Sequence, residues 1–456
     1  MPNCTPSHAQ EEDFVTQMTE RMTETAQRLS QWVAAEPRTL EEMEHQTLKV
    51  IHELGNALLA GLCSLRAPAY PEAEVACSCG QSADYQRIRS VHVDTLLGTI
   101  DLSRPYYLCS SCHHGLAPLD RQLGVCAGGI SAGLAEILAL VGAQFPFEEA
   151  VALIDKLTLV KVSPNLSQQA TEALGQVIEQ QEQQAISAAW DVRHPTLPDP
   201  PPTAPECLYI SMDGTTFNSR EDEWKEVKLG AVYTTITLAP KKRPDQLEVR
   251  ARDITFYADV ADPQAFGRGL WLEAYRRGVK QAKERVVIGD GAHWIWKLAD
   301  EHFPGAIQIV DWYHATEYIW KVAHAIYGEG TDLAKQWARH RLDELWEGQV
   351  DEVLHHFEEH RPTGDVVEKA ITYYVNNQAR MRYPEYRAQG LQIGSGSIES
   401  GCKHVLGARL KQAGMIWNIA GARAVAKVRS RLKSRRWDET IAQRPVPQRS
   451  YHRKAA

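Results

Sequence analysis

Hydrophobic positions in the first part of the chain recur every three to four residues, as in "FVTQMTERMTETAQRLSQWV" and "EEMEHQTLKVIHELGNALLAGL". That period predicts amphipathic helices over residues 10–66, in an N-terminal helical region of residues 1–70. The pattern then changes to alternation in "RIRSVHV" and "TIDLSRPYY", which a glycine-bearing turn joins. Alternation of this kind predicts a β-hairpin, here within a cysteine-rich segment of residues 71–127.

Helical spacing returns in residues 128–193. The stretch "FPFEEAVALIDKLTLVKVSPNLSQQATEALGQVIEQQ" has an amphipathic segment, a break at "KVSPN" and a second helix that we expect to begin near Ser167. This order is typical of a helix-turn-helix DNA-binding motif. The segment is rich in glutamate and glutamine and has few cations to meet phosphate, so a plain helical hairpin explains it equally well.

A proline-rich stretch, "HPTLPDPPPTAPE" at residues 194–206, excludes regular helix and strand, because proline lacks the backbone donor and has a fixed φ angle. We expect a linker there. After it, "CLYISMDGTTFNS", "EWKEVKLGAVYTTITLA" and "LEVRARDITFYADV" have the pattern of strands, and residues 263–321 alternate helical and apolar strand-like runs. The pattern of residues 207–321 therefore predicts an α/β domain, a mixed sheet with helices on its faces.

Three aspartates stand out in this region. Asp213, Asp290 and Asp311 each fall at the predicted carboxyl end of an apolar strand, where a sheet presents side chains to a crevice. One aspartate followed by glycine is most often a turn former. Three carboxylates at equivalent edges repel one another unless a cation neutralises them, so the pattern indicates a metal site.

A fourth acid, Glu399, lies in "IGSGSIESGCKHVLGARLKQAGMIW", where small residues precede it and a helix is predicted to follow. Asp290 and Glu399 are 109 positions apart, which is too long for a loop. The helical patterns "LAKQWARHRLDELWEG" and "DEVLHHFEEHR" predict an all-helical insertion over residues 322–390. The sheet domain would then resume in residues 391–437.

Charge is distributed unevenly along the chain. The formal net charge is −8, yet the segment from Lys403 to the end has fourteen Lys or Arg against Asp438 and Glu439, or +12. A basic arm of this kind indicates contact with a polyanion, although a solvated helix with a basic tail at residues 438–456 would have the same composition. The candidate phosphate contacts are Lys403, Arg409, Lys411, Arg423, Lys427 and Arg431.

Four of the nine cysteines form two pairs, Cys77 with Cys79 and Cys109 with Cys112. The predicted hairpin between the pairs would bring them together, and four thiolates suit tetrahedral zinc. The first pair is one residue tighter than the usual spacing. His113 or His114 could replace one sulfur, and the alternative is a reduced hairpin with incidental thiols.

The 456 residues are long enough for two or three hydrophobic cores. The stretch "AGLAEILALVGAQF" is too short to span a bilayer, and the first residues have no secretion signal. These features predict a soluble, cytoplasmic protein that does not contact membranes.

Several of these motifs together carry a resemblance: "SMDGTT", "EWKEVKLGAV", "VIGDGAHWIW", "IVDWYHATEYIW", and "RMRYPEYRAQGLQIGSGSIESGCKHVLGARLKQAGMIW", with the cysteine hairpin before them. In this combination the chain resembles bacterial DDE transposases of the ISKra type, which are related to the Mutator superfamily. The resemblance covers nearly the whole chain, and "GSGSIES" with "GMIW" is its most specific part.

The resemblance implies a ribonuclease H-like catalytic domain with a helical insertion. It implies that Asp213, Asp290 and Glu399 bind two magnesium or manganese ions and cut DNA at insertion-sequence ends. In the sheet of that family the Asp290 strand adjoins the Asp213 strand, and the Asp311 strand lies one further out. Asp290 is therefore expected to be the second acid.

Asp311 and His314 match the family's "DxxH" signature, an accessory element near the metals. Asp311 could equally be only the cap of the next helix. The expected partners are double-stranded DNA, both the terminal inverted repeats and the target, bound by a homodimer or larger assembly associated with the nucleoid. Two alternatives stay open: a ribonuclease H-like nuclease that only nicks, and a transposase-derived DNA-binding protein that no longer cuts.

Overall fold

The computed structural model describes residues 7–67, 71–239, 248–361, 364–445 and 451–452. The chain forms two compact units, one of Met1–Ala173 with Ile441–Ala456 and the other of Leu174–Thr440.

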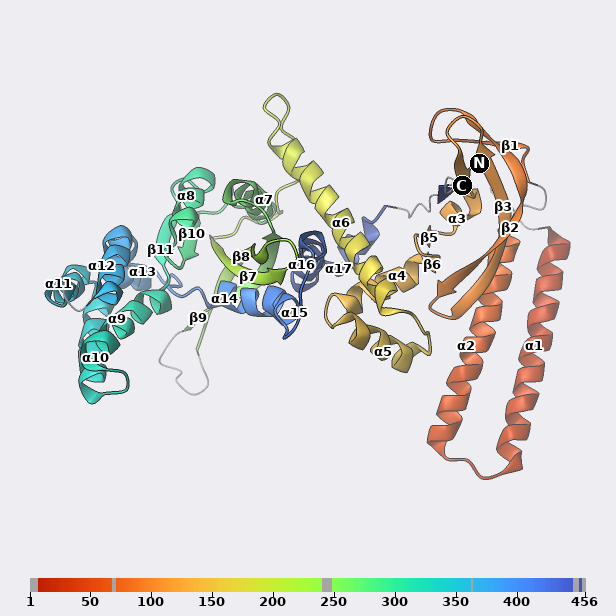
Figure 1. Cartoon of the computed structure of the whole chain (residues 1–456), viewed down its shortest axis with the longest axis horizontal. Coiled ribbons are helices and arrows are strands. Elements are labelled where there is room, and N and C mark those ends of the chain that lie inside the picture. The colour runs from red at the N-terminus through yellow and green to blue at the C-terminus, as the bar shows by residue number, and fades with distance from the viewer. Residues whose placement is uncertain (1–6, 68–70, 240–247, 362–363, 446–450, 453–456) are drawn as a thin grey trace. The chain divides into compact units, whose positions relative to one another are not determined.

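The first unit begins with a helical hairpin, α1 (His8–Ala35) and α2 (Leu40–Leu65), as the helical period predicted (Figure 1). Both helices begin at a capping box. The side chain of the N-cap residue accepts a hydrogen bond from the backbone N–H of the third helical residue, whose side chain accepts one from the backbone N–H of the N-cap residue. Among the described residues, α2 is the one helix long and apolar enough to cross a bilayer. Composition alone is weak evidence for a span, and Leu59 and Cys63 of α2 pack against the sheet that follows.

That sheet contains the predicted cysteine-bearing hairpin. Its long strands β2 and β3 pair in antiparallel register from Ala83 with Cys109 to Thr95 with Gly98. The strand order is β12-β4-β3-β2-β6-β5, and β1 pairs with β2. The strands are β1 (Glu74–Ala76), β2 (Ser82–Thr95), β3 (Gly98–Cys109), β4 (His114–Leu116), β5 (Val125–Cys126), β6 (Ile130–Ser131) and β12 (Tyr451–His452).

Strand β12 belongs to the segment that the sequence predicted to be a basic tail. It pairs with β4, so this part of the tail is a sheet edge. The tail cations Arg449, Arg453 and Lys454 lie outside the described residues.

Helices α3 (Pro118–Gln122), α4 (Ala132–Gly142) and α5 (Phe147–Thr158) complete the first unit with the start of α6 (Pro164–Ala189). Helix α6 begins three residues earlier than the sequence predicted, at Pro164 instead of Ser167. Proline suits a first helical turn because its missing donor is not needed there. The helix-turn-helix interpretation stays a prediction.

The proline-rich segment is irregular, as predicted, but it does not separate the two units. The division falls within α6, before Leu174. The segment lies on the second unit, where a side chain at Gly278 would meet Pro201 and Pro205. The backbone of Glu206 also accepts a hydrogen bond from Glu284 (2.9 Å).

The second unit is built on a five-stranded mixed sheet in the order β11-β10-β7-β8-β9. Strands β7, β8 and β9 are antiparallel neighbours, whereas β10 is parallel to β7 and β11 is parallel to β10. This is the mixed sheet that the sequence predicted. The strands are β7 (Cys207–Ser219), β8 (Glu223–Leu238), β9 (Glu248–Asp259), β10 (Glu284–Gly289) and β11 (Ile307–Val310).

Helices cover both faces of this sheet (Figure 1). Successive residues of β8 point to opposite faces, so Gly230 contacts Leu270 of α7 while Leu229 lies against Gly401 of α14. Helix α16 packs along β9. These helices are α7 (Pro263–Arg276), α8 (His293–His302), α14 (Gly396–Gly401), the π-helical turn η3 (Cys402–Gly407), α15 (Ala408–Leu410) and α16 (Ile419–Lys433). The last helix, α17 (Trp437–Ala442), contains the second division between the two units.

Between β11 and α14 the described chain is entirely helical, as the sequence predicted for the insertion. The elements are α9 (Trp312–Tyr327), α10 (Asp332–Trp346), α11 (Val350–Glu359), α12 (Asp365–Asn377), the 3-10 turn η2 (Gln378–Arg380) and α13 (Tyr383–Ala388). Buried tyrosines attach them to the sheet: Tyr383 donates to the carbonyl of Val310 (3.1 Å), and Tyr386 to that of Gln308 (3.1 Å).

Candidate functional site

Asp213 and Asp290 lie at the same level on neighbouring parallel strands. The β7–β10 register pairs Ser211 with Ile288, and each aspartate is two residues further along. Strands in a sheet are about 4.8 Å apart, so the two carboxyl groups face the same crevice. The expectation that the Asp290 strand adjoins the Asp213 strand, with the Asp311 strand beyond it, agrees with the strand order.

The position of Asp213 within its strand differs from the prediction. Strand β7 continues past Asp213 to Ser219, and Asp213 pairs with Leu229 of β8, so the acid is in the middle of a strand and not at its tip. Asp290 and Asp311 do directly follow β10 and β11. The apolar alternation stops at Asp213 because the strand becomes more polar beyond it, and not because the strand ends.

Burial raises the pKa of Asp213, and the negative charge of Asp290 raises it further. The backbone N–H of Gly214 donates to Asp213 Oδ1 (2.6 Å), while Ala292 N donates to Asp290 Oδ1 (2.8 Å). These hydrogen bonds fix how the carboxyl groups point. Two neighbouring acids, one of them held above its usual pKa, are an arrangement that a bound cation would stabilise.

Glu399 approaches from the short helix α14, and its side chain is about half exposed. Ser395 Oγ donates to Glu399 Oε1 (3.2 Å), and His314 Nε2 is 3.7 Å from the same oxygen. Ligand atoms of Asp311, His314 and Glu399 all lie within 4.8 Å of one another. The structure therefore brings the distant "GSGSIES" and "DxxH" motifs together.

Asp311 is fully buried, and both of its carboxylate oxygens accept backbone hydrogen bonds. Oδ1 caps α9 by accepting from His314 N (2.8 Å), and Oδ2 accepts from Ser395 N. The helix-cap interpretation is thus confirmed. Backbone donors thus engage both oxygens of Asp311, and its carboxylate lies within 4.8 Å of ligand atoms of His314 and Glu399.

Sequence reasoning missed Cys402, the first residue of η3. Its thiol lies beside the Asp213 carboxyl group, and burial raises the pKa of Cys402, with Asp213 and Glu399 adding to the effect. The π-helical turn directly after Glu399 is an irregularity that is frequent at functional sites, but no pattern in the sequence predicts it. Cys402 links the third acid's helix to the first acid's strand.

The six candidate phosphate contacts occupy different environments. Lys403 and Lys411 are exposed, and Lys411 Nζ is 3.1 Å from Thr215 Oγ1, two residues beyond Asp213. Arg409 is 1 % exposed and lies over the ring of Trp417 at 4.7 Å. A side chain so buried does not present its charge to a phosphate, so the prediction for Arg409 is corrected.

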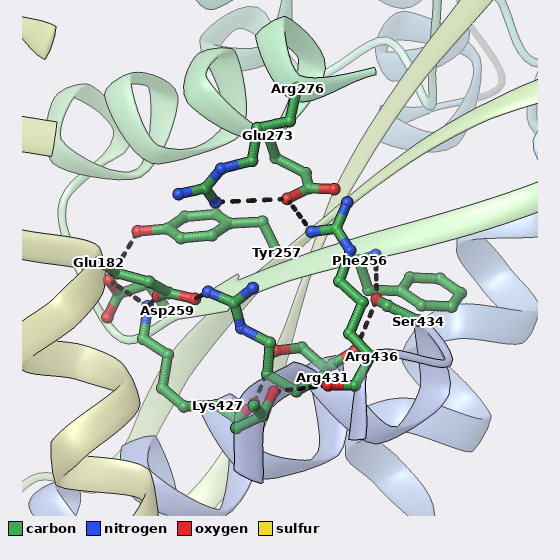
Figure 2. A network of polar contacts seen from close by, with 12 residues as sticks. Glu182, Phe256, Tyr257, Asp259, Glu273, Arg276, Lys427, Arg431, Ser434 and Arg436 are labelled. Carbon is green, nitrogen blue, oxygen red and sulfur yellow. Dashed lines mark hydrogen bonds and ion pairs between the residues drawn. The ribbon is translucent and has the colours of Figure 1, made fainter. Parts of the chain in front are cut away.

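The prediction that Lys427 contacts phosphate is also corrected, because this side chain is fully buried in a network of charges (Figure 2). Its ammonium group lies 2.7 Å from Glu182 Oε2 and 2.9 Å from Asp259 Oδ2. These acids raise the pKa of Lys427, although burial alone would lower it. Lys427 therefore attaches α16 to α6 and β9.

Arg423 and Arg431, on the same helix, are partly buried and paired with acids. Arg423 Nη1 is 3.0 Å from Glu179, and Arg431 Nη2 is 2.9 Å from Glu182. Their charges are largely compensated within the protein. Of the six candidates, Lys403 and Lys411 are the ones that combine exposure with no carboxylate within 4.0 Å among the described residues.

The four paired cysteines come together at one end of the hairpin. Sγ of Cys77 is 3.6 Å from that of Cys112, and Sγ of Cys79 is 3.6 Å from that of Cys109. All four sulfurs lie within 4.8 Å of one another. Zinc–sulfur bonds of about 2.3 Å place two sulfurs of a tetrahedron about 3.8 Å apart, so the cluster fits a metal such as zinc.

Hydrogen bonds support this use of the thiols. The backbone N–H of Cys112 donates to Cys109 and, with further hydrogen bonds, lowers the pKa of that thiol to about 7, which favours the thiolate that a metal binds. The pKa of Cys77 is lowered as well, whereas burial and the neighbouring thiols raise those of Cys79 and Cys112. Thiolates so close together repel one another unless a cation binds them. His113 and His114, the alternative ligands, are not part of the cluster.

Comparison with known proteins adds no assignment. No family model matches the chain, and no curated protein matches it either.

Proposed function

We propose that the protein is a DDE-type transposase that cuts DNA at the ends of an insertion sequence and joins those ends to target DNA. The observation that carries the proposal is the placement of Asp213 and Asp290 in register on neighbouring parallel strands. Glu399 raises the pKa of the same Cys402 thiol as Asp213 does, and its ligand atoms group with those of Asp311 and His314. The strand order β9-β8-β7-β10-β11, with β8 antiparallel to the others, supports a ribonuclease H-like domain.

Asp213, Asp290 and Glu399 would hold the metal ions. Two magnesium or manganese ions bound there would lower the pKa of a water molecule and stabilise the charge on the attacking and leaving oxygens. The protein would hold the scissile phosphodiester so that water attacks it first, and so that the freed 3′ hydroxyl attacks target DNA afterwards. No covalent bond to the protein is needed.

Other parts of the chain would support this activity. Exposed Lys403 and Lys411 are close in sequence to Glu399 and would contact DNA phosphates. The four-cysteine cluster would hold one structural zinc ion. Strand transfer at two ends would require a homodimer or larger assembly on DNA.

The test is metal-dependent cleavage of labelled duplexes that carry the DNA flanking the protein's own gene. Wild type should cut with magnesium or manganese. Asp213→Asn, Asp290→Asn and Glu399→Gln should each bind the DNA and fail to cut, because each removes a metal-binding charge and keeps the side-chain shape. Asp332→Asn, at a fully exposed position of the helical insertion, is the matched control and should cut normally.

The products separate this proposal from its alternatives. Joined products with a second duplex indicate transposition, whereas nicks alone indicate a nuclease. Sequence-specific binding without cleavage by wild type would indicate a DNA-binding protein and would contradict the proposal. Cleavage by Glu399→Gln at the wild-type rate would remove Glu399 from the site.

A further inference from the structure

The basic residues near the end of α16 fall into two sets. Lys427 and Arg431 face inward to Glu182, and Arg436 faces Glu273 at 2.8 Å (Figure 2). Lys433 and Arg435 are exposed instead. No carboxylate of the described residues lies within 4.0 Å of either one.

Lys433 and Arg435 line a cavity of about 640 Å³ at the outer strand of the sheet. Its walls come from β9, from the residue that ends α7 and from the turn after α16. The cavity contains four cations and one acid. The charged residues are Arg252, Arg277, Lys433, Arg435 and Asp253.

Asp253 is the single acid among the lining residues, and Glu273, outside the lining, attracts Arg277. Asp253 Oδ2 is 3.2 Å from Arg252 Nε, a pair that is more than half exposed. Arg277 Nη1 donates to neutral acceptors, the carbonyl of Asp253 (2.5 Å) and the hydroxyl of Thr255 (3.2 Å). Like charges gathered in a hollow repel one another, and an anion bound there relieves the repulsion.

Helix dipoles explain only part of this arrangement. Lys433 is in the last turn of α16 and Arg277 ends α7, where cations stabilise a helix. Arg252 is on strand β9, and Arg435 is two residues after the end of α16. Their presence in the same hollow therefore needs another explanation.

The backbone around the cavity is shaped by two unusual residues. Asp253 (φ 52°) and Arg435 (φ 59°) are both in the left-handed region, which residues other than glycine seldom adopt. Arg435 has this φ because α16 ends in a Schellman motif, in which Arg436 N donates to the carbonyl of Arg431 (3.0 Å) and Arg435 N to that of Leu432 (3.1 Å). The β8–β9 register also shifts beside Asp253, between Val232 and Thr234, which marks a β-bulge. The bulge and the helix end together give this side of the cavity its backbone shape.

Ser434 fastens these two segments together (Figure 2). Its hydroxyl accepts a hydrogen bond from Phe256 N of β9 (2.8 Å) and donates one to the carbonyl of Ser430 in α16 (2.6 Å). The turn that carries Lys433 and Arg435 is thus fixed against the strand that carries Arg252. The backbone positions of the residues that carry these cations are therefore held relative to one another.

We propose that this cavity binds a phosphodiester group of double-stranded DNA, outside the cleavage site; the identity of the DNA as substrate rests on the proposed function. Ala258 of β9 is level with Asp213 through Leu229. Asp253 is five residues before Ala258 and two strands across from Asp213, or about 20 Å away at ~3.3 Å per residue and ~4.8 Å per strand. That separation equals about six base pairs of duplex.

The test measures how the affinity of the full-length protein for a labelled 40-base-pair duplex of arbitrary sequence depends on salt. Each phosphate contact contributes about 0.9 to the slope of log affinity against log salt concentration. The double variant with Lys433→Gln and Arg435→Gln should therefore lower the slope by about 2. Arg252→Gln, a single change on the strand, should lower it by about 1.

The matched control is the double variant with Lys321→Gln and Lys335→Gln, which removes two exposed lysines that each pair with a neighbouring acid. It should leave the slope unchanged. Thermal unfolding of every variant should match that of wild type, which shows that the fold is intact. An unchanged slope in both cavity variants overturns the proposal, as does an equal fall in the control.

Cleavage by wild type is measured in parallel, so that the two proposals fail separately. A fall in slope without any wild-type cleavage supports the cavity and contradicts the transposase assignment. Metal-dependent cleavage by wild type with an unchanged slope in the cavity variants supports the transposase assignment and contradicts the cavity proposal.

Discussion

Asp311 and Ser395 are joined by a hydrogen bond from the backbone N–H of Ser395 to one carboxylate oxygen of Asp311, while the other oxygen caps α9. The side chain of Ser395 in turn donates to Glu399. One buried carboxylate thus sets the position of both His314, in the first turn of α9, and Glu399. In this arrangement Asp311 acts on the site through its neighbours.

Asp311→Asn should therefore reduce DNA cleavage by about 10- to 100-fold without abolishing it, the usual cost of disturbing a supporting residue. An amide can keep one accepting oxygen but places an N–H₂ group opposite the second backbone donor. The loss of that buried bond should lower the free energy of unfolding by about 1 to 3 kcal/mol. Cleavage rates and denaturant unfolding measure the two effects.

Asp262→Asn is the control for Asp311→Asn. Asp262 caps α7 through Oδ1 alone, and asparagine caps a helix as well as aspartate does. Its activity and stability should stay near wild type. Equal cleavage rates and stabilities in the two variants would show that Asp311 acts only as a helix cap.

Asp213→Asn should stabilise the metal-free protein at neutral pH. Burial first, and then Asp290, raise the folded-state pKa of Asp213 above its ordinary 3.8, so this group's contribution to stability is present below pH 3.8 and is lost as pH rises through the folded pKa. The variant does not ionise and keeps its stability over that range. Unfolding curves from pH 4 to 8 should diverge with rising pH.

Added magnesium should reverse that difference, because the ion stabilises the wild-type carboxylate and binds the variant less well. Asp222→Asn, at an exposed acid in the same unit, should show neither effect. A wild type that is more stable than Asp213→Asn at pH 8 without metal would contradict the assigned pKa direction.

The purified protein should contain about one zinc ion per chain, since four thiolates at these distances form one closed tetrahedral site. Cys109→Ser should lower the zinc content to well under half an equivalent and make residues 71–127 sensitive to protease. Cys63→Ser, which changes an isolated thiol in the same unit, should retain the metal. Elemental analysis of carefully reduced protein decides between these outcomes.

Lys427→Met and Lys433→Met should affect different properties, stability and DNA binding, although both remove one lysine from α16. Lys427→Met leaves Glu182 and Asp259 with less compensation in a buried place, which should lower the free energy of unfolding by about 3 to 5 kcal/mol. Lys433→Met should change stability by less than about 0.5 kcal/mol.

DNA binding provides the second readout for this pair of variants. The salt dependence should fall by about one contact in Lys433→Met and should stay unchanged in folded Lys427→Met. A salt slope that falls only in Lys427→Met would restore Lys427 as a DNA contact and contradict its buried role.

The strands, the helical insertion and the acids at the ends of β10 and β11 could be predicted because each depends on local period and on the residue that follows a run. The environment of Lys427 could not, since its acidic partners are on α6 and β9, far away in the sequence. Composition assigned a charge to the segment after Lys403 but not a direction for each side chain.

The predicted end of β7 at Asp213 was wrong for a similar reason. Beyond Asp213 the strand carries polar residues that pair with β8, and the pairing that keeps them in a strand is supplied by residues 223–229. Cys402 was missed because its contact with Asp213 depends on the π-helical turn. Both errors concern partners that the local pattern does not specify.

The chain leaves the sheet at the start of α9 and returns before α14 at one point, because Trp312 N donates to the carbonyl of Ile393 (3.0 Å) just beside the Asp311–Ser395 bond. A segment that leaves and re-enters the sheet domain at one point can change in length without pulling its anchors apart. Insertions and deletions between α10 and α11 would therefore alter the periphery while Glu399 kept its place. Natural variants of this chain could explore new contacts there at little risk to the carboxylate cluster.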